Sequence, residues 1–138
     1  MGLSIRLRPE PGVLRVLATG EFFLVEAQQH FLEVMDAVDQ SKATRVLVDG
    51  RHVTGNPETI ERFLYGEFAA SAVARYLTED AARGAPQFAY VLHEPVLDPL
   101  RFGETVAVNR GMWLKVFDSL EDAQSWLGLN VTTDARDT

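Results

Sequence analysis

The chain has 138 residues and a mass of 15.4 kDa, which suits one domain with a single hydrophobic core. Hydrophobic residues make up 46% and charged residues 24%, so a disordered or fibrous chain is excluded. Cysteine is absent, which excludes disulfides, thiolate metal sites and cysteine nucleophiles. The net charge of −7 disfavours nucleic-acid binding, and no apolar run reaches the ~20 residues of a membrane span. We therefore expect a cytoplasmic protein without nucleic acid, membrane insertion or cofactor.

The first part of the chain predicts a hairpin, a helix and a buried strand. Apolar and polar residues alternate over 3–8, and a second strand over 13–18 follows a short Pro-Glu-Pro-Gly turn. From Gly20 onward, apolar residues recur at helical spacing as far as Val38. The run 45–49 is short and β-branched, which is typical of a central parallel strand.

The second part alternates helices with strands. Asn56 and Pro57 favour a helix start, and the apolar spacing extends that helix to Arg83. The remaining predicted elements are a strand over 88–92, a helix over 98–106, a strand over 113–117 and a final helix that begins after Ser119 and ends at Leu127.

The predicted element order is β-β-α-β-α-β-α-β-α. Strands that alternate with helices indicate an α/β fold with a mostly parallel, five-stranded sheet. The hairpin makes the first strand antiparallel to the second. We expect one domain over residues 1–128 and a flexible polar tail over 129–138.

Three phrases in this order resemble the STAS superfamily, named for sulfate transporters and anti-sigma-factor antagonists. They are Gly20-Glu-Phe, Arg45-Val-Leu-Val-Asp-Gly, and the stretch from Val116 to Leu127 with its capped Ala-Gln-Ser-Trp-Leu helix. The chain is most similar to the small bacterial group called sporulation stage II AA-like, or STAS/SEC14-type. The resemblance implies helices mainly on one face of the sheet and no enzyme activity.

In the regulatory branch of that superfamily, a loop after the third strand carries a phosphorylated serine in an Asp-Ser-Ser-Gly phrase. Pro57 and Glu58 occupy the Asp-Ser positions here, and Thr59 stands where the second serine would be. The usual phosphoacceptor serine is therefore missing. Thr54 and Thr59 are weak candidates for phosphorylation, and capping or solvent exposure is the favoured explanation for both.

Polar residues gather where the third and fourth predicted strands end. Open parallel sheets place ligands beyond the carboxyl ends of their strands, so these side chains form a candidate polar edge site. It comprises Asp49, Arg51, His52, Thr54, His93 and Glu94. Such a group suits anion binding or acid–base chemistry, but strand ends are also where polar residues ordinarily collect. The histidines lack any metal-binding spacing.

The second predicted helix has apolar residues beyond a single stripe. The candidate interface or pocket residues on it are Phe63, Leu64, Phe68, Tyr76 and Leu77. The excess predicts one of three outcomes: a break near Gly66 or Thr78, a two-fold dimer, or a lid over an apolar pocket.

We conclude from the sequence that the chain is a non-enzymatic STAS-type interaction domain, a homodimer that binds an unidentified protein partner. The alternative is a module that binds a small apolar molecule or lipid beneath the second helix. An enzyme that uses the polar edge is a third hypothesis.

Overall fold

A computed structural model describes residues 2–80, 82–98 and 100–129. Its strands are β1 (Ser4–Glu10), β2 (Val13–Glu21), β3 (Arg45–Thr54), β4 (Gln87–Leu92) and β5 (Leu114–Phe117). Its helices are α1 (Leu24–Ser41), α2 (Thr59–Glu79), α3 (Phe102–Asn109) and α4 (Leu120–Leu127). The predicted element order is confirmed.

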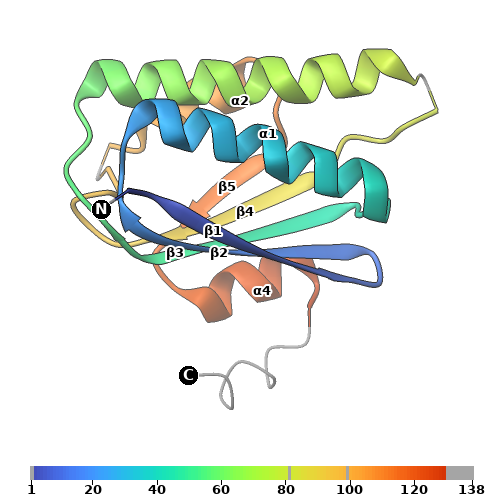
Figure 1. The fold of residues 1–138 in the computed structure, drawn as a ribbon, viewed down its shortest axis with the longest axis horizontal. Helices are drawn as coiled ribbons and strands as arrows, with labels where there is room; N and C mark the ends of the chain where they lie inside the picture. Colours follow the sequence, from blue (N-terminus) through green and yellow to red (C-terminus); the bar gives the residue numbers. More distant parts are fainter. Residues whose placement is uncertain (1, 81, 99, 130–138) are drawn as a thin grey trace.

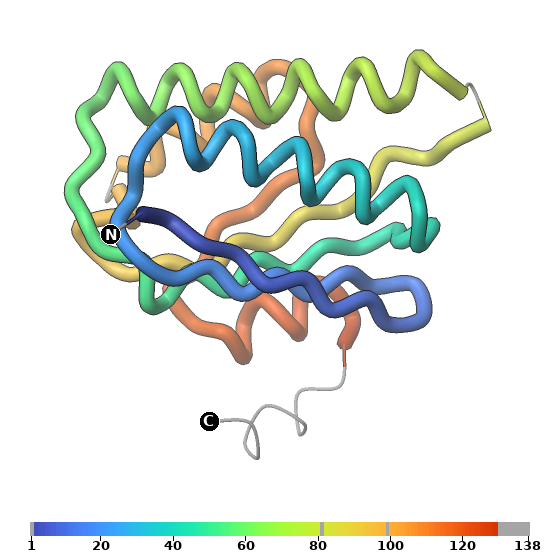
Figure 2. Tube along the Cα trace, in the orientation of Figure 1, coloured from blue at the N-terminus to red at the C-terminus, as the bar shows by residue number. Residues whose placement is uncertain are grey.

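The sheet has five strands in the order β1-β2-β3-β4-β5. β1 runs antiparallel to β2 and the other neighbours are parallel, as the sequence predicts. Helices α1 and α2 lie side by side on one face, and α4 covers the other (Figure 1). Figure 2 shows the same arrangement along the Cα trace, in which α1 and α2 each cross the face of the sheet. The expectation of helices mainly on one face is confirmed.

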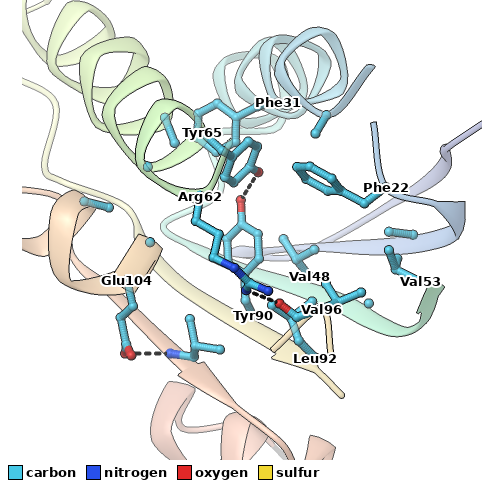
Figure 3. A pocket seen from close by; sticks show the side chains of 18 of the residues that line it. Phe22, Phe31, Val48, Val53, Arg62, Tyr65, Tyr90, Leu92, Val96 and Glu104 are labelled. Carbon is cyan, nitrogen blue, oxygen red and sulfur yellow. Dashed lines mark hydrogen bonds between the residues drawn. The ribbon is translucent and has the colours of Figure 1, made fainter. Parts of the chain in front are cut away.

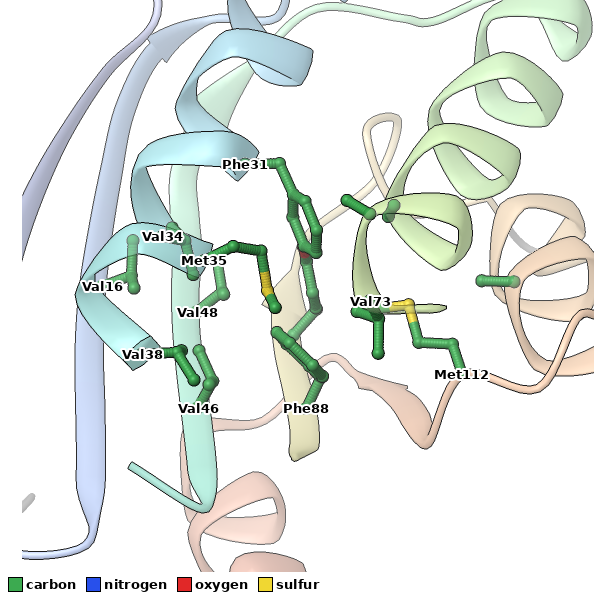
Figure 4. Packing of buried hydrophobic residues seen from close by; sticks show 14 of the residues in the cluster. Val16, Phe31, Val34, Met35, Val38, Val46, Val48, Val73, Phe88 and Met112 are labelled. Carbon is green, nitrogen blue, oxygen red and sulfur yellow. The ribbon is translucent and has the colours of Figure 1, made fainter. Parts of the chain in front are cut away.

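The main core lies between the sheet and α1 and α2. Alternate strand residues such as Val46 and Phe88 point to this side and meet Phe31, Met35 and Val38 of α1 (Figure 4). The intervening strand residues, including Leu47 and Val91, face α4 and form a smaller core. Each strand of the centre is therefore buried on both faces, which explains its continuous apolar sequence.

The boundaries of α2 correct the prediction at both ends. The helix begins at Thr59 with Glu58 as its N-cap, rather than with Asn56 and Pro57, because Glu61 accepts the Glu58 backbone N–H at 2.8 Å. It ends at Glu79, four residues before Arg83. The Arg83 guanidinium instead reaches back and donates to the Tyr76 carbonyl oxygen at 2.7 Å, satisfying an acceptor of the last turn.

Other boundaries differ for local reasons. β3 continues five residues past Asp49 because β2 pairs with it as far as Thr54. α3 begins at Phe102 and not at Asp98, whose carboxylate accepts the N–H groups of Leu100 and Phe102 in a turn before the helix.

The predicted break in α2 is wrong at Gly66, through which the helix runs without interruption. No helix of the described part of the chain is both long and apolar enough to cross a bilayer. Leu129, the first residue of the predicted tail, packs on the core beneath α4, and residues 130–138 lie outside the described part.

Candidate functional site

The carboxyl end of β3 contains a register shift against β2. Leu17 pairs with Asp49, but Thr19 pairs with His52, so β3 holds one extra residue between them. Gly50 lies at this point, where a Cβ would come within 2.8 Å of a Leu92 methyl carbon. The Gly50-Arg51-His52 stretch, which follows the strand predicted over 45–49, is therefore an irregular piece of strand.

Asp49 and Arg51 form the centre of the polar edge. Two parallel hydrogen bonds join the guanidinium to the carboxylate, each of 2.9 Å, and the Arg51 backbone N–H adds a third at 3.2 Å. Burial alone would raise the pKa of Asp49. The hydrogen bonds and charge of Arg51, with a smaller contribution from His52, outweigh burial and lower the pKa. The carboxylate is thus held charged by its neighbours.

The other predicted edge residues are spread more widely. Thr54 donates its hydroxyl to the Gly20 carbonyl oxygen of β2 at 3.4 Å. His93 and Glu94 follow the end of β4, and both are exposed, as is His52. The structure therefore holds Asp49 and Arg51 together directly, and His52 lies close enough to act on the Asp49 carboxylate.

The amino end of α2 occupies the place of the expected regulatory loop. Thr59 is its first residue and is exposed, while Glu58 is the N-cap. Carboxylates at a helix start are stabilised by the helix dipole and by free backbone N–H groups. Glu58 thus has a capping role that accounts for a carboxylate at this position.

A pocket of about 170 Å³ lies between the sheet and the amino half of α2 (Figure 3). Its walls are mostly apolar and come from the sheet and from the helices that cover this side of it. They include Phe31 from α1, Val48 from β3, Leu92 from β4 and Ala69 from α2. The pocket lies beneath the second helix, although Phe63, Leu64, Phe68, Tyr76 and Leu77 are not among its lining residues.

Two tyrosines meet inside the pocket. The Tyr65 hydroxyl of α2 and the Tyr90 hydroxyl of β4 share a hydrogen bond of 2.7 Å (Figure 3). Burial raises the pKa of Tyr65 to about 12, although its bond to Tyr90 opposes the rise. Burial likewise raises the pKa of Tyr90 well above its ordinary value. Both side chains therefore stay neutral near neutral pH.

Arg62 lies in the pocket wall and binds three backbone carbonyl oxygens. Its guanidinium donates to the carbonyl oxygens of Pro57 at 3.1 Å, Val96 at 2.7 Å and Pro95 at 2.8 Å. The side chain thereby fastens α2 to the segment that follows β4. Sequence reasoning missed Arg62, Tyr65 and Tyr90 as a group, because only the fold brings these elements together.

The five candidate interface residues of α2 have mostly internal contacts. Phe68, Tyr76 and Leu77 pack against the main core, and Phe63 contacts the Phe102 ring of α3. Leu64 is the exposed member, at 36%. The broad apolar cover of the helix is thus largely explained by its position between α1 and α3.

No cluster of His, Asp and Glu side chains that suits a metal ion occurs in the part of the chain that the structure describes. His30 of α1 is used structurally: Nε2 donates to the Leu3 carbonyl oxygen at 2.7 Å and Nδ1 faces Glu33 at 2.9 Å. His52 and His93 lie on the polar edge instead.

Two solved structures resemble this chain over nearly its full length. An anti-sigma factor antagonist from Mycobacterium paratuberculosis matches 91% of this chain and 94% of its own, with a TM-score of 0.55 and 15% identity. The anti-sigma factor antagonist SpoIIAA in its unphosphorylated form matches 92% and 99%, with a TM-score of 0.55 and 12% identity. The chain has the STAS fold. No protein-family model and no curated protein matches the sequence.

The STAS fold explains where the candidate sites lie. The parallel strands β2, β3 and β4 send their carboxyl ends to one edge, so the loops that enter α1 and α2 are neighbours there. The Phe22 backbone N–H donates to the Thr54 carbonyl oxygen at 2.9 Å, which joins these two loops. The polar edge, the pocket and the amino end of α2 therefore adjoin one another.

Proposed function

We propose that this chain is a non-enzymatic interaction domain that binds a protein partner through the amino ends of α1 and α2. The supporting comparison is the fold that it shares with two anti-sigma factor antagonists. Because sequence identity is low, the partner surface must be argued from this chain's own residues.

The observation that carries the proposal is a set of exposed apolar side chains at this end. We call Phe23, Ile60 and Leu64 the amino-end patch; their exposed fractions are 45%, 56% and 36%. Phe22, beside Phe23 in the chain, contacts the Tyr65 ring of α2 with a centroid distance of 6.4 Å. The two helix starts are therefore packed together, and their exposed apolar groups suit a protein interface.

The charge around the amino-end patch indicates the chemistry of the partner. Glu21 and Glu58 are exposed beside it, and the chain as a whole carries a net charge of −7. A partner that presents apolar side chains ringed by Lys or Arg would complement this surface. Thr59 adjoins Glu58, so its phosphorylation would add negative charge to the same surface and strengthen such a contact.

The test is affinity capture from the native cell with the full chain as bait, at ordinary and raised salt. We expect a partner whose capture is lost with Ile60→Glu and retained with Val108→Glu, which adds the same charge at an exposed apolar position of α3. Raised salt should weaken the contact, because charge attraction contributes to it. If the Ile60→Glu variant captures the partner as well as the wild-type chain does, the proposal is contradicted.

We also propose that the free chain is a homodimer in which the amino-end patch of one copy meets that of a second. A partner protein would then compete with self-association for Ile60 and Leu64.

A further inference from the structure

The pocket beneath α2 contains a hydrogen-bond donor that the protein does not use. Two hydroxyl groups carry two O–H donors, and the mutual bond of Tyr65 and Tyr90 uses one of them. Among the described residues, no acceptor receives the second O–H. Leaving a buried donor unpaired costs free energy, so an acceptor from outside the protein would stabilise this arrangement.

The other polar side chains of the pocket wall are already engaged. The Glu104 carboxylate accepts the Val116 N–H at 2.9 Å, and the Asp98 carboxylate accepts two backbone N–H groups. His30 contacts acceptors through both ring nitrogens, and Arg62 donates to three carbonyl oxygens. Arg101 donates to the Val116 carbonyl oxygen and lies 3.6 Å from the Glu104 carboxylate. The unused tyrosine O–H is thus the group best placed to donate a hydrogen bond to a ligand and determine which ligand binds.

The size and lining of the pocket define the rest of the ligand. An apolar cavity of about 150 Å³ holds one benzene molecule, and this pocket measures about 170 Å³. Phe31, Val48 and Leu92 supply apolar walls around it (Figure 3). An ionised group would be desolvated there, and the two guanidinium groups of the wall, Arg62 and Arg101, already have partners within the protein, which disfavours carboxylates.

We propose that the pocket binds a small uncharged molecule, about the size of a substituted benzene, that presents one carbonyl-type oxygen to the Tyr65–Tyr90 pair. The binding is reversible and involves no covalent step. The pocket uses residues other than those of the amino-end patch, because Phe23, Ile60 and Leu64 do not line it.

The test titrates the full chain with three probes while backbone amide signals are followed by NMR. Acetophenone carries the acceptor oxygen, cumene has a similar size without any polar atom, and benzoate carries a charge. We expect acetophenone to shift the amides of α2 and β4 and to bind about tenfold more tightly than cumene, the effect of one added hydrogen bond. Equal binding of acetophenone and cumene, stronger binding of benzoate, or no binding of any probe would overturn the proposal.

Tyrosine variants identify the donor. The double variant Tyr65→Phe/Tyr90→Phe should bind acetophenone no better than cumene, because both O–H groups are gone. Tyr65→Phe alone should keep the preference, since the remaining Tyr90 hydroxyl is released from its partner. Tyr76→Phe, on the same helix but outside the pocket, is the matched control and should behave as the wild type. A double variant that folds and keeps the preference would refute the role of the pair; if it does not fold, the wild-type comparison of acetophenone with cumene decides.

Discussion

Gly66 of α2 lies directly against Gly103 of α3. A Cβ placed on Gly66 would be 2.7 Å from the Gly103 carbonyl oxygen and 3.4 Å from the Val106 Cβ. This approach lets α2 lie close to α3, and the helix is continuous at Gly66, where a break is one of the outcomes predicted from the sequence. A residue that weakens a helix by its intrinsic preference thus strengthens the packing between two helices.

Gly66→Ala should destabilise the fold although alanine is the better helix former. The helical preference would contribute up to ~1 kcal/mol in favour of alanine, whereas overpacking against backbone costs about 1–3 kcal/mol. We expect a net loss in the free energy of unfolding, measured by urea denaturation. Gly84→Ala is the control, because its Cβ would meet nothing within 4 Å. Equal stability of the two variants would contradict the close contact.

Arg62→Lys should destabilise the protein by about 1–3 kcal/mol, since one ammonium group cannot replace a fork of donors to several carbonyl oxygens. The three acceptors belong to two separate segments, so the variant should also loosen the turn after β4. Urea unfolding gives the first quantity, and amide hydrogen exchange near Val96 gives the second. Arg75→Lys, exposed on the same helix, should change stability by no more than about 0.5 kcal/mol.

The sequence predicts the element order and the sheet well because those depend on local pattern. Alternation marks β1, and the apolar run from Arg45 marks a strand covered on both sides. Predicted boundaries are wrong where a contact outside the apolar pattern decides them. β3 reaches Thr54 because β2 pairs with it there, and α2 stops before Arg83, whose side chain folds back onto the helix.

The candidate site is predicted less well than the fold. Asp49 and Arg51 are two residues apart, so their pairing is a local contact that the sequence can suggest. Tyr65 and Tyr90 are 25 residues apart and meet only after α2 crosses β4. The sequence offers a faint signal for Tyr90, a polar group within a run that is otherwise apolar and buried. Nothing local indicates its partner.

Stability should fall as pH rises from about 6.5, because of His30. Burial would lower its pKa, but hydrogen bonds to Glu33 and the Leu3 carbonyl, with the charges of Glu33 and Glu26, raise it overall. A group whose pKa is raised by folding stabilises the protein below its unfolded pKa, and this contribution is lost as pH passes through the folded pKa. Urea unfolding between about pH 6 and about pH 8 measures the slope.

His30→Gln should remove this part of the pH dependence, and Glu33→Gln should reduce it while leaving the imidazole bound to Leu3. Glu67→Gln, on α2 and paired with Arg110, serves as a charge-matched control for Glu33→Gln. If His30→Gln keeps the slope of the wild type across this range, the histidine is not its source.

Salt should separate self-association from binding to a basic partner. Meeting of two amino-end patches would bring the carboxylates of Glu58 and Glu61 of both copies to the same interface. Like charges repel, and salt screens them over about 10 Å at 0.1 M, so dimerisation should strengthen as salt rises. Contact with a basic partner should weaken under the same change.

Light scattering should therefore give a mass that moves toward twice the 15.4 kDa of one chain as salt increases. Leu64→Glu should hold the protein at the mass of one chain, and Val108→Glu should not. A wild-type chain that stays monomeric at micromolar concentration in both salt conditions would refute the dimer and leave the partner surface unobstructed.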